Sequence, residues 1–421
     1  MVALVELDLS FTGITELPNS IACLKKLERL SLMGCLKIKK LPDPLGDLRS
    51  LIELDISSAH LIELPDSIGN LEELKVIRME GCRVRKLPKS VGMMKKLEEL
   101  HADSSSLEGE MPIEIGMLSA MRILDLSSTN ICLLPSTTSQ LSSLQILKLH
   151  GCRMLGELPI LPTSLVSLVF SSSEELGMVP DVSKLTNLTD LSLFIEIKGN
   201  SWGQIRPTNK RYSHQSESPN PSRWMRQEWA IKRRMGWIAN LHKLERLALH
   251  VLNIPSVPAE LSTLSQLKNL SLSGPELREI PQLPTNLWCL NLSLLAANTK
   301  LPCLSNLKQL THLRFLLCAI TEDGFESLGI GELEQLECLK VANDKTDLTG
   351  LRLPVNLRRL YITECRHVKL LPNISHLKNL KVLCSKDCKE LTEIPGLAEL
   401  EPPPKVSIDS CDSLKLLNIK T

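Results

Sequence analysis

The stretch LERLSLMGCLKIKKLP, from Leu27 to Pro42, determines how the whole chain is interpreted. It contains the pattern L-x-x-L-x-L, then a Gly-Cys pair, and it closes on Leu-Pro. The same line returns almost unchanged from Leu144 to Pro159. Between these two stretches, copies begin at Leu51, Leu74, Leu97 and Met121. Self-similarity at a period of about 23 residues indicates a repeat protein, because a period in this range is typical of stacked structural units.

Along the whole chain the pattern begins 17 times. The repeats start at Leu4, Leu27, Leu51, Leu74, Leu97, Met121, Leu144, Leu165, Leu188, Leu244, Leu267, Leu287, Leu310, Leu336, Leu357 and Leu380, with a degenerate last copy around Val406 and Ile408. The pattern predicts an α/β leucine-rich-repeat solenoid, a horseshoe or arc with a parallel β-sheet on its concave face. We assign repeats 1–9 to residues 1–195, an irregular insertion to 196–240, and repeats 10–17 with a C-terminal tail to 241–421.

Each repeat contains the same succession of local signals. The short strand alternates apolar and polar residues, which predicts one buried face and one exposed face. A Leu-Pro step then ends the return segment, because proline disfavours the helical conformation at the residue before it. We expect short helical or irregular turns on the outer face after this step, for example at 19–21 and 66–69.

The 13 cysteines are not spaced like the cysteines of a small disulfide-bonded domain. Seven of them occupy one slot, eight residues after the first apolar position of the repeat: Cys35, Cys82, Cys152, Cys318, Cys365, Cys388 and Cys411. Residues at one slot stack above each other in a solenoid. We therefore predict a structural role, in which a small buried side chain bonds backbone groups where the strand turns. Free thiols in this number favour a reducing compartment.

The bulk composition excludes some classes of protein. A net charge of +1 gives no case for binding nucleic acid or an anionic membrane, and aromatic residues at 3% predict an aliphatic core. The sequence has no signal peptide and no apolar run long enough to span a bilayer. We expect a cytoplasmic or nuclear protein. Because no capping segment precedes Leu4, we also expect the chain to be a piece of a larger protein.

No motif for chemistry stands in the sequence. It lacks a phosphate-binding loop, an H-E-x-x-H zinc motif, a G-x-S-x-G nucleophile and a Gly-rich dinucleotide fingerprint. Cys384 and Cys388 suggest a metal pair by spacing. In the repeat register, however, Cys384 projects outward from the exposed face of its strand, whereas Cys388 fills the buried cysteine slot, so the two side chains diverge. We expect no enzyme activity, no cofactor and no metal in this chain.

The third, fifth and seventh positions of each repeat are predicted to face the concave side, where repeat proteins bind partners. They are mainly acidic in the early repeats and basic in the late ones, a polarity that would orient a partner protein. The candidate partner-binding residues are Glu53, Asp55, Arg78, Glu99, His101, Asp103, Arg314, Lys340, Arg359 and Tyr361. The alternative interpretation is a solvated face, since aspartate also belongs to a recurring L-D-[LI]-S phrase.

The insertion at 196–240 differs in composition from the rest of the chain. It contains four of the five tryptophans and nine basic residues against three acidic ones. Its first part is rich in Ser, Pro and Asn, which predicts disorder, and residues 223–238 have a helical pattern. The candidate residues here are Trp224, Arg226, Trp229 and Arg233. Three interpretations stay open: a solvated loop with a packed Trp cluster, a docking arm for a partner or for this chain itself, and a membrane or nucleic-acid patch.

The phrase L-x-x-L-x-L-x-G-C-x-x-L-x-x-L-P, as at Leu27–Pro42 and Leu144–Pro159, resembles the repeats of plant intracellular nucleotide-binding leucine-rich-repeat disease-resistance proteins. The similarity is to the class bearing a Toll/interleukin-1 receptor domain, and the S-I-G-x-L phrase at Ser67–Leu71 and the ending VSIDSCDSL at Val406–Leu414 share it. It covers nearly the whole chain apart from the insertion. The resemblance implies a sensor domain that recognises a pathogen effector or a guarded host protein and holds the receptor inactive until then.

The family's nucleotide-binding and signalling domains are not in this sequence, so their activities are not carried over. If the chain is a fragment, the nucleotide-binding domain of the same receptor is a further expected partner. Two other classes remain: a free-standing intracellular scaffold, which would have its own caps, and a cell-surface receptor ectodomain. The ectodomain would require a signal peptide and paired cysteine caps.

Overall fold

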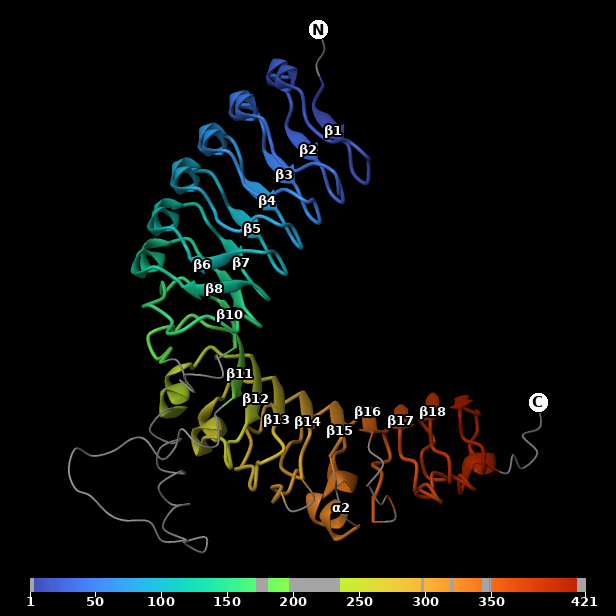
Figure 1. Ribbon diagram of the computed structural model, residues 1–421. Coiled ribbons are helices and arrows are strands. Elements are labelled where there is room, and N and C mark those ends of the chain that lie inside the picture. Colours follow the sequence, from blue (N-terminus) through green and yellow to red (C-terminus); the bar gives the residue numbers. More distant parts are fainter. Residues whose placement is uncertain are drawn as a thin grey trace, which may run out of the picture. The chain divides into compact units, whose positions relative to one another are not determined.

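This computed structural model describes residues 4–171, 181–196, 235–296, 299–318, 322–342, 348 and 350–414. The chain forms two compact units, Met1–Ile195 and Glu196–Thr421. Each unit is a stack of coils in which every coil contributes one short strand (Figure 1). The predicted leucine-rich-repeat architecture is confirmed, with 17 parallel strands for the 17 predicted repeats.

Nine of these strands belong to the first unit. They are β1 (Glu6–Asp8), β2 (Arg29–Ser31), β3 (Glu53–Asp55), β4 (Val76–Arg78), β5 (Glu99–His101), β7 (Ile123–Asp125), β9 (Ile146–Leu149), β10 (Ser167–Ser171) and β11 (Asp190–Glu196). From β1 to β11, neighbouring repeats pair their strands in parallel, so that equivalent positions stand side by side.

The second unit contains the other eight strands. They are β12 (Arg246–Leu252), β13 (Asn269–Ser273), β14 (Cys289–Ser293), β15 (His312–Leu316), β16 (Cys338–Ala342), β17 (Arg359–Thr363), β18 (Val382–Lys386) and β19 (Lys405–Asp409). The degenerate last repeat predicted around Val406 therefore forms a regular strand. Pairing is again parallel and in repeat register from β12 to β19.

The first, fourth and sixth positions of the repeat form the core. In the second repeat these are Leu27, Leu30 and Leu32, which are at most 1% exposed. The third, fifth and seventh positions point to the other side of the sheet, because successive side chains of a strand alternate between its faces. We call this surface the strand face. The sheet is thus buried by leucine on one side and open on the other within each unit.

The predicted outer turns are short 3₁₀ helices, which lie opposite the strands within each unit (Figure 1). In the first unit they are η1 (Asn19–Cys23), η2 (Asp43–Asp47), η3 (Asp66–Asn70), η4 (Lys89–Met93), η5 (Ile113–Met117) and η6 (Ser136–Gln140). In the second they are η8 (Gly236–Asn240), η9 (Ala259–Thr263), η10 (Ile330–Glu332) and η11 (Leu397–Glu399), with an α-helix, α2 (Glu322–Leu328), between β15 and β16. Five residues between Pro and the next Leu favour the tighter 3₁₀ bond pattern, which is common in short pieces.

Glycine in these turns allows neighbouring coils to approach closely. A Cβ atom added at Gly69 in η3 would stand 2.5 Å from the backbone oxygen of Ser90 in the next coil. Equivalent glycines stand at positions 46, 92 and 116 with the same kind of neighbour. The S-I-G phrase of the sequence is therefore explained by stacking: only a residue without a side chain fits between two backbones at this distance.

The Gly-Cys pair has a separate explanation for each residue. The residue after the seventh position adopts a left-handed conformation, with φ of +67° at Gly34 and +73° at Gly151. Glycine adopts it freely, whereas another residue is strained by about 1 kcal/mol. The cysteine that follows is buried, and its thiol donates to a backbone carbonyl of the preceding coil, as from Cys152 Sγ to Leu126 O at 3.0 Å.

The predicted hydrogen-bonding role of the cysteine slot is confirmed at six of its seven positions. The thiols of Cys35, Cys152, Cys318, Cys365, Cys388 and Cys411 all donate to the carbonyl of the sixth position one repeat earlier. Burial raises the pKa of the Cys318 thiol to about 11. The hydrogen bond to the Cys365 thiol is the largest cause that lowers the pKa of the Cys388 thiol, to about 6. The hydrogen bonds of the cysteine slot join one coil to the next.

One element has no counterpart in the sequence prediction. Strands β6 (Glu108–Glu110) and β8 (Asn130–Leu133) pair in parallel as a second, two-stranded sheet in the first unit. Their register shifts between Gly109 and Glu110, because Gly109 pairs with Ile131 and Glu110 with Leu133. The extra residue, Cys132, lies on β8 and is accommodated as an irregularity of the pairing.

Most of the predicted insertion, including Trp224, Arg226, Trp229 and Arg233, lies outside the described residues. At its end, residues 236–240 form η8, in which Ile238 is fully buried. This turn precedes β12 in the same way that η9 precedes β13. The helix predicted over 223–238 lies in the described part only at 235–238, and 236–238 belong to this 3₁₀ turn. Among the described residues, no helix is both long and apolar enough to cross a bilayer.

Candidate functional site

The strand face of the first unit contains the six candidate residues of the early repeats. Glu53 and Asp55 lie on β3, Arg78 on β4, and Glu99 and His101 on β5, with Asp103 just after that strand. Their alignment follows from the register, which pairs Glu53 with Val76 and Asp55 with Arg78 on the next strand. The structure therefore brings these residues together on one surface, all of them half-buried.

The cations of this face are already paired. Arg78 Nε donates to Glu53 Oε1 at 3.1 Å, and His101 Nε2 lies 2.9 Å from Glu99 Oε2. The same arrangement occurs between Arg29 and Glu6 and between Lys148 and Asp125. Each Arg or Lys partner is thus opposed by a carboxylate one strand earlier. Such pairs satisfy charges within the face rather than present them to a partner.

An excess of carboxylates remains beside these pairs. The pKa of the Asp103 carboxyl is raised above its usual value. Burial is the largest cause, and the negative charges of the nearby Asp125 and Glu80 raise it further. Asp55 accepts the backbone N–H of Ser57, and Glu80 accepts the hydroxyl of the same serine. The strand face of the first unit is therefore acidic, and Asp55 and Glu80 on it accept internal hydrogen bonds.

The strand face of the second unit is different at β15–β17, although Lys386 on β18 lies 3.7 Å from a carboxylate oxygen of Asp409. Arg314 on β15, Lys340 on β16 and Tyr361 on β17 stand in one row, each in register with the next. In the part of the chain that the structure describes, no ion pair involves Arg314, Lys340 or Arg359. We call Arg314, Lys340, Arg359 and Tyr361 the basic row. All four are candidate residues from the sequence.

Arg359 is held in place by a directed chain of hydrogen bonds. Its Nη2 lies 3.2 Å from His312 Nε2, across the strand between them, so the ring nitrogen must accept. The other ring nitrogen then donates to Thr311 Oγ1 at 2.9 Å, and that hydroxyl donates to the carbonyl oxygen of Trp288 at 2.9 Å. His312 is therefore neutral. Burial first, and then Arg359 and Arg314, lower the pKa of His312, which agrees with a positive potential here.

Two cysteines extend this surface, and the sequence analysis did not select them. Cys289 on β14 and Cys338 on β16 occupy the third position of their repeats, so each flanks His312 in register. The signal was present in the sequence, because both follow from counting positions within the repeat. Burial raises the pKa of both thiols, and this keeps them protonated and makes the basic row the charged part of the surface.

Comparison with solved structures places this architecture among known folds. The chain is similar to a leucine-rich-repeat protein of Leptospira interrogans, with 23% identity and a TM-score of 0.58, over 92% of this chain and 91% of the other. The fold is a leucine-rich-repeat solenoid. An internalin from Listeria monocytogenes is also similar, with 16% identity and a TM-score of 0.52, over 91% of this chain and 87% of the other.

A third similar structure is a TDR receptor, with 19% identity and a TM-score of 0.51, over 93% of this chain and 76% of the other. At these identities the likeness shows the leucine-rich-repeat fold alone. No protein-family model matches the chain, and a search of curated proteins finds no match either.

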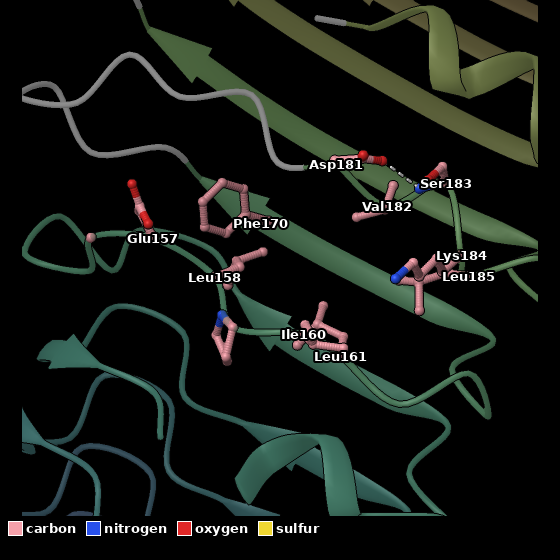
Figure 2. A pocket seen from close by; sticks show the side chains of 12 residues that line it. Glu157, Leu158, Ile160, Leu161, Phe170, Asp181, Val182, Ser183, Lys184 and Leu185 are labelled. Carbon is pink, nitrogen blue, oxygen red and sulfur yellow. Dashed lines mark hydrogen bonds between the residues drawn. The ribbon is translucent and has the colours of Figure 1, made fainter. Parts of the chain in front are cut away.

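The leucine-rich-repeat chain also has a cavity of about 390 Å³ in its first unit. Figure 2 shows its lining: Phe170 from β10, Leu158 and Ile160 from the preceding loop, and Val182 from the following one. The Asp181 carboxylate accepts the backbone N–H of Ser183 at 2.9 Å. Glu157 and Lys184 also line the cavity, whose other side chains are mainly apolar.

The predicted divergence of Cys384 and Cys388 agrees with their burial. Cys384 on β18 is half-buried at the fifth position of its repeat, on the strand face, whereas Cys388 is fully buried in the cysteine slot. Within the described ranges, no three His, Cys, Asp or Glu side chains gather as metal ligands do.

Proposed function

We propose that this chain is a protein-recognition domain whose binding surface is the basic row of the second unit. The proposal rests on the register, which places Arg314 beside Lys340 and Lys340 beside Tyr361. No described carboxylate forms an ion pair with Arg314 or Lys340. Cations without a carboxylate partner beside a half-buried aromatic side chain are typical of protein interfaces, where Arg and Tyr are enriched. The acidic face of the first unit is a weaker candidate, because its cations already have partners.

We further propose that the domain is the sensor of a plant intracellular immune receptor, in the cytoplasm or the nucleus. The Gly-Cys repeats that resemble that family support this proposal, and so do the 13 cysteines, all of which are free thiols. The partner would be a pathogen effector or a guarded host protein. This repeat domain would also contact the nucleotide-binding domain of the same receptor and hold the receptor inactive.

The experiment is a proximity-labelling or pull-down comparison in plant cells. We expect the wild-type chain to capture a partner protein, and the combined change Arg314→Glu, Lys340→Glu and Tyr361→Ala to reduce capture by about tenfold or more. Charge reversal at an interface centre removes attraction and adds repulsion, each of which weakens binding. The readout is the amount of the captured partner by quantitative mass spectrometry.

A matched control reverses two charges elsewhere in the same unit. Lys308→Glu with Arg366→Glu alters two exposed residues that lie outside the strands, so capture should stay at the wild-type level. Equal loss in both variants would refute the basic row as the binding surface. Unchanged capture in the first variant would do the same.

A further inference from the structure

In most described repeats the residue after the seventh position adopts a left-handed conformation, and we call this position the left-handed slot. Two leucines occupy it in the second unit. Among the described repeats, the slot holds glycine at positions 34, 81 and 151, and serine or an acidic residue at most others. Leu294 and Leu317 adopt the same conformation, each with a φ of +56°. A branched apolar side chain is disfavoured there. Nothing in the coil geometry requires leucine, since coils of the first unit form the same turn with glycine or serine.

Both leucines are also exposed, and they stand next to each other. Leu294 follows β14 and is 42% exposed, and Leu317 follows β15 and is 52% exposed. The backbone N–H of Leu294 donates to the carbonyl of Leu316 at 2.9 Å, which fixes the two turns side by side. Leu316, at the seventh position of β15, is half-buried beside them. These three side chains form a small apolar patch, which we call the leucine strip.

Phe11 is the other large apolar residue at this slot in the described repeats, and its surroundings differ. A Cβ atom at Gly34 in the next coil would stand 2.5 Å from the Phe11 ring, so the ring packs on that glycine. Leu294 has no glycine next to it in the following coil, where Leu317 stands. Leu294 therefore lacks the packing explanation that holds for Phe11.

The leucine strip borders the basic row. Arg314 lies two residues before Leu316 on β15, and its side chain is exposed on the strand face. Lys340 stands beside Arg314 on the neighbouring strand. Unpaired positive charge and exposed apolar surface thus adjoin on β14–β16, a combination that favours a ligand with negative charge and apolar bulk side by side.

We infer that the leucine strip and the basic row together bind an acidic peptide segment of a partner protein, one that carries a bulky apolar side chain beside its carboxylates. The carboxylates would pair with Arg314 and Lys340, and the apolar side chain would cover Leu294 and Leu317. The inference rests on the proposed function and specifies its partner. It also explains the strain: glycine at the slot would relax the backbone but remove the apolar contact.

The test uses a random peptide library displayed on phage and selected on the purified full chain. Peptides enriched on the wild-type chain should contain Asp or Glu close to Leu, Ile or Phe. The best synthetic peptide should then bind the double variant Leu294→Gly with Leu317→Gly at least about tenfold more weakly. The melting temperature of this variant should equal or exceed that of the wild-type chain, because glycine suits the left-handed slot.

Two controls separate this inference from the proposed function. Phe11→Gly removes an apolar residue from the same slot in the first unit and should leave peptide binding unchanged. Arg314→Glu with Lys340→Glu should abolish binding. If these reversals abolish it while the glycine variant binds normally, the basic row stands and the leucine strip fails.

Other outcomes also overturn the inference. A fall in melting temperature for the glycine variant would assign the two leucines to the fold rather than to a partner. Enrichment of acidic peptides without an apolar residue, or tighter binding of a single-stranded oligonucleotide or of anionic lipid vesicles than of the selected peptide, would assign the surface to another anion. No enrichment on the wild-type chain would contradict the proposed function as well.

Discussion

Replacing Leu149 by aspartate is expected to unfold the coils around β9 and to lower the free energy of unfolding by about 4 kcal/mol or more. Leu149 is fully buried at the sixth position of its repeat and stands in register with Phe170 on β10. A carboxylate there would lose its hydration with no cation in the stacked core to replace it. Because each coil depends on its neighbours, the damage should extend to adjacent repeats.

Urea denaturation followed by circular dichroism measures this effect. The matched control is Ile160→Asp, which makes a similar change in the same unit at a side chain that is 72% exposed. It should shift the midpoint little. Identical denaturation midpoints for the two variants would contradict the register of β9.

The second large effect is expected at Gly69. Substitution by valine should destabilise the first unit by about 2 kcal/mol or more, because overpacking forces the surroundings to move. The Cβ atom alone would stand 2.5 Å from the Ser90 carbonyl oxygen, which belongs to backbone rather than to a flexible side chain. The coils would have to separate at η3 and η4, and adjacent strands would lose part of their pairing.

Thermal unfolding, monitored by circular dichroism, gives the measurement. Gly13→Val is the control, since the nearest atom to a Cβ there is Lys37 Nζ at 3.9 Å, the end of a flexible side chain. The account requires a clear fall in melting temperature for Gly69→Val and a small change for the control. A stable Gly69→Val protein would show that the glycine column has no stacking role.

The repeat itself could be predicted from the sequence because every coil solves the same packing problem. Leu27, Leu30 and Leu32 recur at fixed spacing, and the structure buries them as the period indicates. The Cys slot was predictable for the same reason, since a residue that recurs at one position meets the same backbone carbonyl in each coil. The strand face followed from alternation, and the basic row lies where the register placed it.

What the sequence analysis missed depends on contacts between coils. Repeat positions place Arg78 and Glu53 on one face, but only the structure shows that they form an ion pair, which leaves them less available to a partner protein. The bond from Arg359 to His312 crosses an intervening strand, and no pattern within one repeat indicates it. The parallel pair β6 and β8 arises from an irregular coil. Leu294 and Leu317 were visible as departures from glycine, but their strain appears only in the backbone dihedral angles.

We propose that a partner protein contacts the strand face of β15–β17. The most direct measurement places a photo-cross-linking phenylalanine analogue at Tyr361, within the basic row, or at Val355, which is 57% exposed in the turn before β17. After irradiation in plant cells, we expect a cross-linked partner from position 361 and little or none from position 355. Equal cross-linking at both positions, or cross-linking at 355 alone, would contradict it.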